Sequence, residues 1–151
     1  MTVPGDIDGV SIVPLRVIAD ERGAVMHMLR ADAPHFSQFG EIYFSLVNAG
    51  AIKGWKRHNR MTLQLAAPSG RVRLALFDDR RASTSHGRTQ ILELGADADI
   101  YRLVIVPPGV WTAFKGLGPG PALVANCATI PHDPGEADNR PLSDPPVVIE
   151  W

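Results

Sequence analysis

The sequence has only one cysteine, a net charge close to zero and no long apolar run. A single cysteine, Cys127, excludes an intramolecular disulfide and is typical of a reducing compartment. The formal net charge of −1 argues against attraction of the whole chain to nucleic acid or to a membrane surface. No segment approaches the roughly 20 apolar residues of a membrane span, and the N-terminus lacks the features of a signal peptide. We therefore expect a cytoplasmic protein that binds neither nucleic acid nor membrane.

Helical periodicity is also rare, whereas turn residues are frequent. Thirteen prolines and fourteen glycines separate short β-branched or alternating segments. Strands at a spacing of about 8–12 residues predict an antiparallel sandwich or barrel, and the length suits one domain over residues 1–151. The strands are expected at residues 9–19 (broken at Pro14), 24–29, 41–48, 61–67, 71–77, 89–94, 100–106, 110–115 and 122–128. The apolar end of the tail, up to Trp151, is expected to dock on the fold.

The segment from Gly50 to Gly70 concentrates the candidate chemistry. Lys56 and His58 are two residues apart, so they share one face of an extended strand, whereas Lys53 is out of phase with them. A cation and an imidazole on an inner face are costly to bury and indicate a functional site. The same residues on an exposed face would merely keep a sheet edge soluble, and their spacing does not separate these readings.

Two short patterns in the sequence resemble the motifs of cupins. The first runs from Gly50 through Lys56, His58 and Thr62 to Gly70, and the second is Pro107 to Thr112. Cupin metal sites use four ligands from these motifs, and only His58 keeps a ligand type here. A protonated lysine cannot bind a metal, and a metal needs about three or four suitable donors. We therefore expect no metal and no cofactor.

Five segments, taken in order, resemble the dTDP-4-dehydrorhamnose 3,5-epimerases, a branch of the cupins. They are Asp20–Gly23, Gly50–Lys56, Phe77–Ser83, Val106–Phe114 and the stretch from Ser143 to Trp151. The resemblance implies an all-β cupin jelly roll, a nucleotide sugar as the ligand, and a homodimer. Members of the family dimerise by exchanging N-terminal strands, and Ser11–Ile18 is the matching segment here.

The resemblance also implies catalytic positions, several of which have changed. In the family, a histidine held by an aspartate removes protons beside a C4 ketone, a lysine stabilises the enolate, and a tyrosine returns a proton. The histidine falls on Lys56 and the aspartate on Asp144, while the lysine falls near Thr62 or Leu63. The tyrosine falls close to Pro131 or His132.

Two replacement mechanisms are open from these changes. A desolvated Lys56 would act as the base itself, or His58 would be the base with His132 as the acid. The opposite charge of Asp144 favours protonated Lys56. This favours His58 as the base and Lys56 as its electrostatic partner.

The expected substrate-binding residues surround this set. The family pattern assigns Arg22 to the diphosphate, for which a guanidinium is well suited. Tyr43 and Phe44 alternate, so one of them is expected to face the cavity, and either could stack on the ligand. Lys53 and Thr112 are expected on the floor of the pocket, with Arg80 in a matching loop. The resulting hypothesis is a metal-free epimerase or isomerase of a dTDP-4-keto-6-deoxy sugar in polysaccharide or deoxysugar biosynthesis. The alternative is a non-catalytic cupin that binds a nucleotide sugar or another anion.

Overall fold

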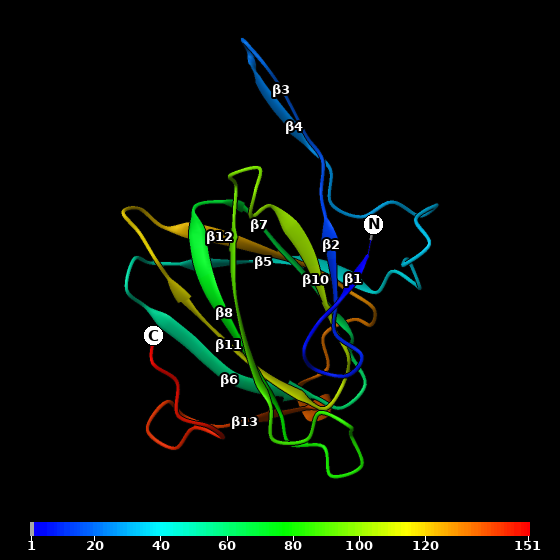
Figure 1. Ribbon diagram of the computed structural model, residues 1–151, viewed down its shortest axis with the longest axis vertical. Helices are drawn as coiled ribbons and strands as arrows, with labels where there is room; N and C mark the ends of the chain where they lie inside the picture. Colours follow the sequence, from blue (N-terminus) through cyan, green and yellow to red (C-terminus); the bar gives the residue numbers. More distant parts are fainter. Residues whose placement is uncertain (1) are drawn as a thin grey trace.

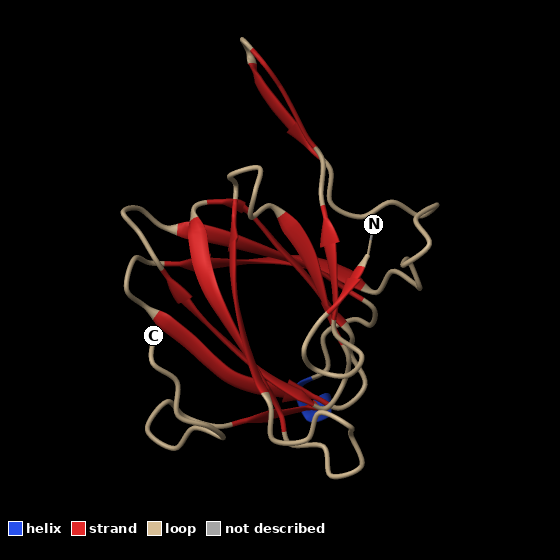
Figure 2. Cartoon of the chain, in the orientation of Figure 1, coloured by secondary structure: helices blue, strands red, loops and turns tan. Residues whose placement is uncertain are grey.

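Two antiparallel sheets face each other in the computed structural model, which describes residues 2–151 (Figures 1 and 2). The six-stranded sheet has the order β1 (Val3–Pro4), β2 (Ser11–Pro14), β10 (Arg102–Val106), β7 (Leu63–Ser69), β12 (Ala122–Ala128) and β5 (Glu41–Val47). The five-stranded sheet has the order β13 (Ala137–Asn139), β6 (Ile52–His58), β11 (Val110–Gly116), β8 (Arg71–Asp78) and β9 (Thr89–Gly95). This is the all-β cupin jelly roll expected from the sequence.

A two-stranded hairpin stands away from these sheets, at the top of Figure 1. It consists of β3 (Val17–Asp20) and β4 (Gly23–Met26), joined by a tight turn between Asp20 and Gly23. Gly23 has a φ of 143°, which a side chain would disfavour. The hairpin leaves Ile18 and Val25 largely exposed.

The main core fills the space between the two sheets. Alternate residues of β8 show the pattern: Val72, Leu74 and Leu76 are almost completely buried in this core. Burial of such side chains is the main favourable contribution to folding, at about 1.5–3 kcal/mol for each. The core occupies one part of the inter-sheet space, and the cavity described below occupies another.

A second apolar cluster covers the outer face of the five-stranded sheet. Trp55 and Trp111 are buried there, and the tail residues Val147, Ile149 and Trp151 pack against them. The Trp55 and Trp151 ring centroids are 6.3 Å apart. The predicted docking of the C-terminal tail is therefore confirmed.

The segment after Ile130 has more structure than the sequence indicated. The turn η1 (Pro134–Glu136) begins at Asp133, whose side chain accepts a hydrogen bond from the Gly135 amide. Proline at the first position of the turn suits a helical φ. β13 follows at once and pairs with the end of β6, placing Ala137 opposite His58. This docking brings an acidic residue from the far end of the chain to the candidate site.

Candidate active site

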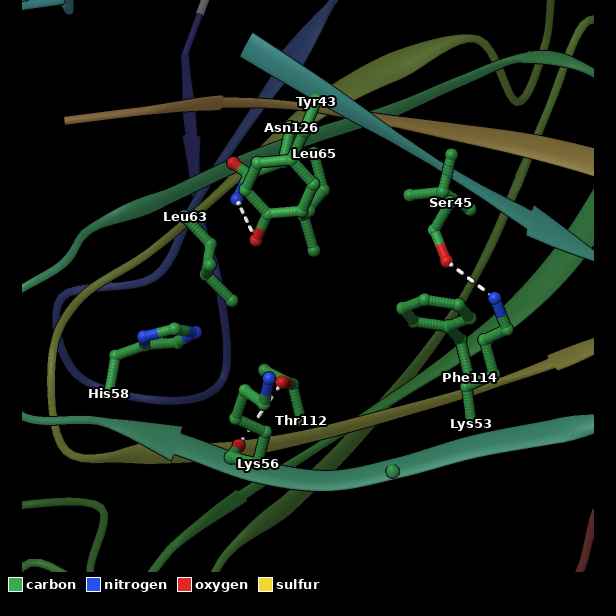
Figure 3. A pocket seen from close by; sticks show the side chains of 12 residues that line it. Tyr43, Ser45, Lys53, Lys56, His58, Leu63, Leu65, Thr112, Phe114 and Asn126 are labelled. Carbon is green, nitrogen blue, oxygen red and sulfur yellow. Dashed lines mark hydrogen bonds between the residues drawn. The ribbon is translucent and has the colours of Figure 1, made fainter. Parts of the chain in front are cut away.

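A cavity of about 210 Å³ lies between the two sheets (Figure 3). One wall comes from the five-stranded sheet, and β6 and β11 supply its residues: Lys53, Gly54, Lys56, His58, Thr112 and Phe114. This wall carries the two lysines and the histidine. The predicted shared face of Lys56 and His58 is thus confirmed.

A β-bulge explains why Lys53 also reaches the cavity. Strict alternation would point Lys53 away from it, but the register between β11 and β6 shifts at this point. Thr112 lies opposite Lys56 and the next residue, Ala113, lies opposite Gly54, so Trp55 is the extra residue. A Cβ on residue 54 would overlap the Ala113 side chain, so glycine is required for this close approach. Trp55 consequently packs outward while both lysines face inward.

His58 is paired with a buried carboxylate at one end of the cavity. The imidazole is 7% exposed, and its Nδ1 hydrogen-bonds with Oε1 of Glu136, which is 4% exposed. Oε2 of Glu136 accepts the backbone amides of Asn59, Arg60 and Met61 at 3.2, 3.0 and 3.2 Å. The carboxylate therefore holds the imidazole and is itself fixed by the loop after β6.

The charge of Glu136 follows from its environment. Burial acts to raise the pKa of its carboxyl, but the hydrogen bonds from His58 and from the Arg60 and Met61 amides outweigh this and lower the pKa to about 2. Glu136 is thus an anion at neutral pH and acts only as an acceptor. In its neutral form His58 donates its Nδ1 hydrogen to Glu136 and keeps the lone pair on Nε2. This is the form required of a general base.

Two lysines lie along the same wall with different surroundings. Lys53 Nζ donates to Ser45 Oγ of β5 at 2.9 Å, which links the two sheets across the cavity. Within residues 2–151, the Lys56 ammonium has neither a hydrogen bond nor an ion pair with a side chain, and the residue is exposed. Lys56 could act as the base only if burial removed water from its amine, and the exposed position of the residue contradicts this. It suits a free positive charge that faces the ligand.

The opposite wall is apolar except at one end. The six-stranded sheet contributes Tyr43, Ser45, Leu63, Leu65, Val124 and Asn126. Tyr43 and Asn126 form a hydrogen-bonded pair, with 2.9 Å between Asn126 Nδ2 and the Tyr43 hydroxyl oxygen. In Figure 3 the hydroxyl of Tyr43 points from this wall into the cavity, toward the side of Lys56 and His58.

The model of the dTDP-4-dehydrorhamnose 3,5-epimerase family matches residues 4–151 of this chain. The chain belongs to that family. A solved structure of a dTDP sugar isomerase from Desulfovibrio desulfuricans G20 is 47% identical, with a TM-score of 0.89, and the match covers 92% of this chain and 88% of that one.

Two curated relatives match over nearly their whole length. The Bacillus subtilis spore coat polysaccharide biosynthesis protein SpsL is 27% identical over 147 residues, which are 96% of this chain and 96% of the relative. The probable low-salt glycan biosynthesis epimerase Agl13 of Haloferax volcanii is 27% identical over 150 residues, which are 97% and 95% of the two chains.

The aspartate and the acid expected from the family pattern lie elsewhere. Asp144 does not line the cavity, so its predicted position beside Lys56 is wrong. The tail runs along β6 through backbone hydrogen bonds between Trp55 and Arg140 and then turns onto the outer face of the sheet, where Asp144 pairs with Arg140 at 2.9 Å. His132 is also outside the cavity lining; it is exposed, and its amide donates to Glu41 Oε1 at 2.8 Å.

Neither arginine of the family pattern lines the cavity. Arg80 Nε binds the buried Asp78 carboxylate at 2.8 Å, within the loop after β8. Although burial opposes it, hydrogen bonding from Arg80, Ser83 and Ser85 holds the pKa of Asp78 well below its usual range. Arg22 pairs with Asp20 at 2.7 Å on the projecting hairpin (Figure 1). Arg80 thus stabilises a loop, while Arg22 is presented away from the sheets.

Glu136 is the main site residue that the sequence did not reveal. It is 78 positions from His58, and only the pairing of β13 with β6 brings the two together. Asn126 was also missed, because it lies in an otherwise apolar strand. Its signal was a lone amide at an inward position of that strand.

Two further searches of residues 2–151 gave negative results. No helix among them is long and apolar enough to cross a membrane. In the same part of the chain, no group of three or more His, Cys, Asp or Glu side chains is arranged to hold a metal ion.

Proposed function

We propose that this chain is a metal-free epimerase or isomerase of a dTDP-4-keto-6-deoxy sugar, with His58 as the base. The observation that supports the proposal most is the His58–Glu136 pair at the end of the cavity. A buried anion orients the ring and stabilises the imidazolium that forms when His58 takes a proton. The family histidine is replaced by Lys56, and His58 takes over its task from the same face of the same strand.

The first chemical step is removal of a proton from a carbon next to the ketone. His58 Nε2 takes the proton, and the electron pair of the C–H bond moves into the carbonyl to form an enolate. The unpaired Lys56 ammonium, on the same wall, stabilises the negative oxygen. The family lysine near Thr62 or Leu63 is thereby replaced by a cation from β6.

The size of the cavity indicates how the substrate binds. At about 210 Å³ it is smaller than the roughly 300–1,000 Å³ typical of pockets that enclose a drug-sized ligand. We infer that the sugar ring enters the cavity while the nucleotide lies at its mouth, where the exposed lysines of this wall, Lys53 and Lys56, supply positive charge. The relatives named for spore coat polysaccharide and glycan biosynthesis support a role of the product in glycan assembly.

Non-catalytic binding is the second candidate. It is favoured by the replacement of two of the three histidines of the cupin motifs, by Lys56 in the first motif and Thr112 in the second, and by the position of His132 outside the cavity. In that case Lys56 and Lys53 would serve only to hold an anionic nucleotide sugar.

We further propose that the protein is a homodimer. β5 is an edge strand, and it reverses the usual pattern of apolar side chains inside and polar side chains outside. Its apolar residues Ile42, Phe44 and Leu46 point outward and are 48%, 60% and 66% exposed. Its polar residues Tyr43 and Ser45 face the cavity. An exposed apolar strand edge is normally covered. Ser11–Pro14 already pairs with β10 of its own chain, so the hairpin β3–β4 is the part left to reach a partner.

Light scattering after size exclusion tests this assembly. A mass twice that of the chain, reduced to a single chain by Phe44→Glu, supports the dimer. A single-chain mass for the unsubstituted protein at all concentrations contradicts it.

Proton–deuterium exchange tests the enzymatic function. The protein is incubated in deuterated water with dTDP-4-keto-6-deoxyglucose, and NMR follows the signals of C3–H and C5–H. Exchange that His58→Ala abolishes supports the proposed reaction. Saturable binding without exchange would support the binding function instead. If the protein shows neither exchange nor binding, this sugar nucleotide is excluded as the ligand under both functions.

A further inference from the structure

The pair of Tyr43 and Asn126 has no part in the base chemistry described above. Tyr43 is on β5 and Asn126 on the neighbouring β12, where the two residues lie directly opposite each other. Asn126 is 2% exposed, whereas Tyr43 is 36% exposed and opens onto the cavity. A buried amide that supports a half-exposed phenol is an arrangement for presenting the hydroxyl group.

The direction of the hydrogen bonds determines what the phenol can do. The backbone N–H of Gln64 can only donate, and it reaches Asn126 Oδ1 at 2.9 Å. The amide is thereby oriented with Nδ2 toward Tyr43, to whose oxygen it donates at 2.9 Å. The phenol oxygen is the acceptor in this bond, so its own hydrogen is free to point into the cavity. The same Asn126 N–H would stabilise a phenolate after that hydrogen has left.

Tyr43 also faces the base from the opposite side. His58 and Lys56 come from the five-stranded sheet and Tyr43 from the six-stranded sheet, with the cavity between them (Figure 3). Inversion of a carbon next to a ketone requires removal of the proton on one face and its return on the other. Among the residues described as lining the cavity, Tyr43 is the one on the second wall with an acidic hydrogen free for this.

We propose that Tyr43 is the proton donor that completes epimerisation and that Asn126 is its positioning residue. This inference rests on the proposed function. In the step, the enolate carbon takes the hydroxyl hydrogen of Tyr43, and the enolate electrons form the new C–H bond as the ketone is restored. The phenolate that remains is held by Asn126 and then takes a proton from water, while the imidazolium of His58 releases one. The donor is thus supplied by β5, and not by the segment around Pro131 and His132.

Tyr43→Phe in deuterated water separates inversion from exchange. His58 still removes the substrate proton and returns a deuteron to the same face, so exchange with retention continues. Inversion, measured as the rate of appearance of the epimer, falls by about 100-fold or more, the usual contribution of a general acid. Asn126→Asp, which cannot donate to the phenol when ionised, lowers the ratio of inversion to exchange in the same direction while KM changes little.

Tyr101→Phe is the matched control, because Tyr101 is the other tyrosine of the chain, is 3% exposed and does not line the cavity. It should leave the ratio unchanged. Inversion that survives in Tyr43→Phe overturns the role of Tyr43 but leaves the base intact. A lack of exchange in the unsubstituted protein overturns the proposed function, and the role of Tyr43 with it.

Discussion

The two faces of strand β6 carry similar residues in opposite situations. On the outer face, Arg57 binds Asp79 at 3.0 Å and Asp138 at 2.9 Å and lies over the Trp111 ring at 4.7 Å. On the inner face, Lys56 has no side-chain partner within residues 2–151, and His58 keeps one ring nitrogen free after pairing with Glu136.

The difference separates charge used for stability from charge available to a ligand. The guanidinium of Arg57 has two carboxylates and an aromatic face, so it has no capacity left for a substrate. Lys56 and the free ring nitrogen of His58 have no side-chain partner, so both are available to a ligand in the cavity. On this strand, incomplete pairing is the better indicator of function than charge itself. Four substitutions test this comparison, and they are ordered by their expected effect on the exchange rate.

His58→Gln should have the largest effect. It keeps a polar side chain of similar size but cannot take a proton at neutral pH, so we expect exchange to fall by about 1,000-fold. The measurement is initial deuterium incorporation at a saturating concentration of the 4-keto sugar nucleotide. Exchange within tenfold of the unsubstituted rate would show that His58 is not the base.

Glu136→Gln should follow, with a fall of about 100-fold in kcat and little change in KM. The amide keeps the shape, but it no longer stabilises the imidazolium. Single-turnover kinetics separate this from a binding effect. An equal loss in a variant that leaves His58 untouched, such as Asp144→Asn, would argue against a specific role for Glu136.

The same substitution has a pH signature in stability. The pKa of Glu136 is lowered from 4.5 to about 2, so folding favours its ionised form. The stabilisation, roughly 3 kcal/mol, is fully present above pH 4.5 and is lost as the pH falls toward 2. Urea unfolding at pH 7 and pH 3 should therefore show that the advantage over Glu136→Gln shrinks in acid. The buried Asp78 titrates in both proteins and cancels in the difference.

Lys56→Met should lower exchange by about tenfold, because an exposed ammonium contributes less than a buried one. The effect should diminish further at high salt. Loss of all exchange would make Lys56 the base and reverse the assignment made here.

Arg57→Met should change exchange by less than about twofold, although it lies between the two site residues. Removing its ion pairs and its stacking on Trp111 should destabilise the protein by about 1–2 kcal/mol. Thermal unfolding measures the loss of stability, and the exchange assay measures the chemistry. A large fall in exchange without a fall in stability would contradict the conclusion that the outer face serves stability and the inner face serves the ligand.

Most of the fold was predictable because local signals determine it. Proline and glycine mark the turns, and alternation within each segment defines an inner face, as for Val72 and Leu74 of β8. A period of two also placed Lys56 and His58 together. The position of Lys53 was not predictable from that period, because the bulge at Trp55 shifts the phase and depends on contact with Ala113.

The partners of the site residues could not be predicted from local sequence patterns. Glu136 meets His58 only because β13 docks on the edge of β6, a contact between distant segments. Asp144 was misplaced for the same reason: family spacing suggested the cavity, whereas packing of Trp151 on Trp55 draws the tail to the outer face.

The position of the tryptophans has a practical consequence. All three, Trp55, Trp111 and Trp151, belong to the cluster on the outer face of the five-stranded sheet. Their intrinsic fluorescence therefore senses release of the C-terminal tail and reports only indirectly on a molecule between the sheets. A change in tryptophan emission during a nucleotide-sugar titration would mean that ligand binding on the inner face of β6 alters the packing on its outer face. Tryptophan fluorescence therefore measures coupling between the two faces without an added label.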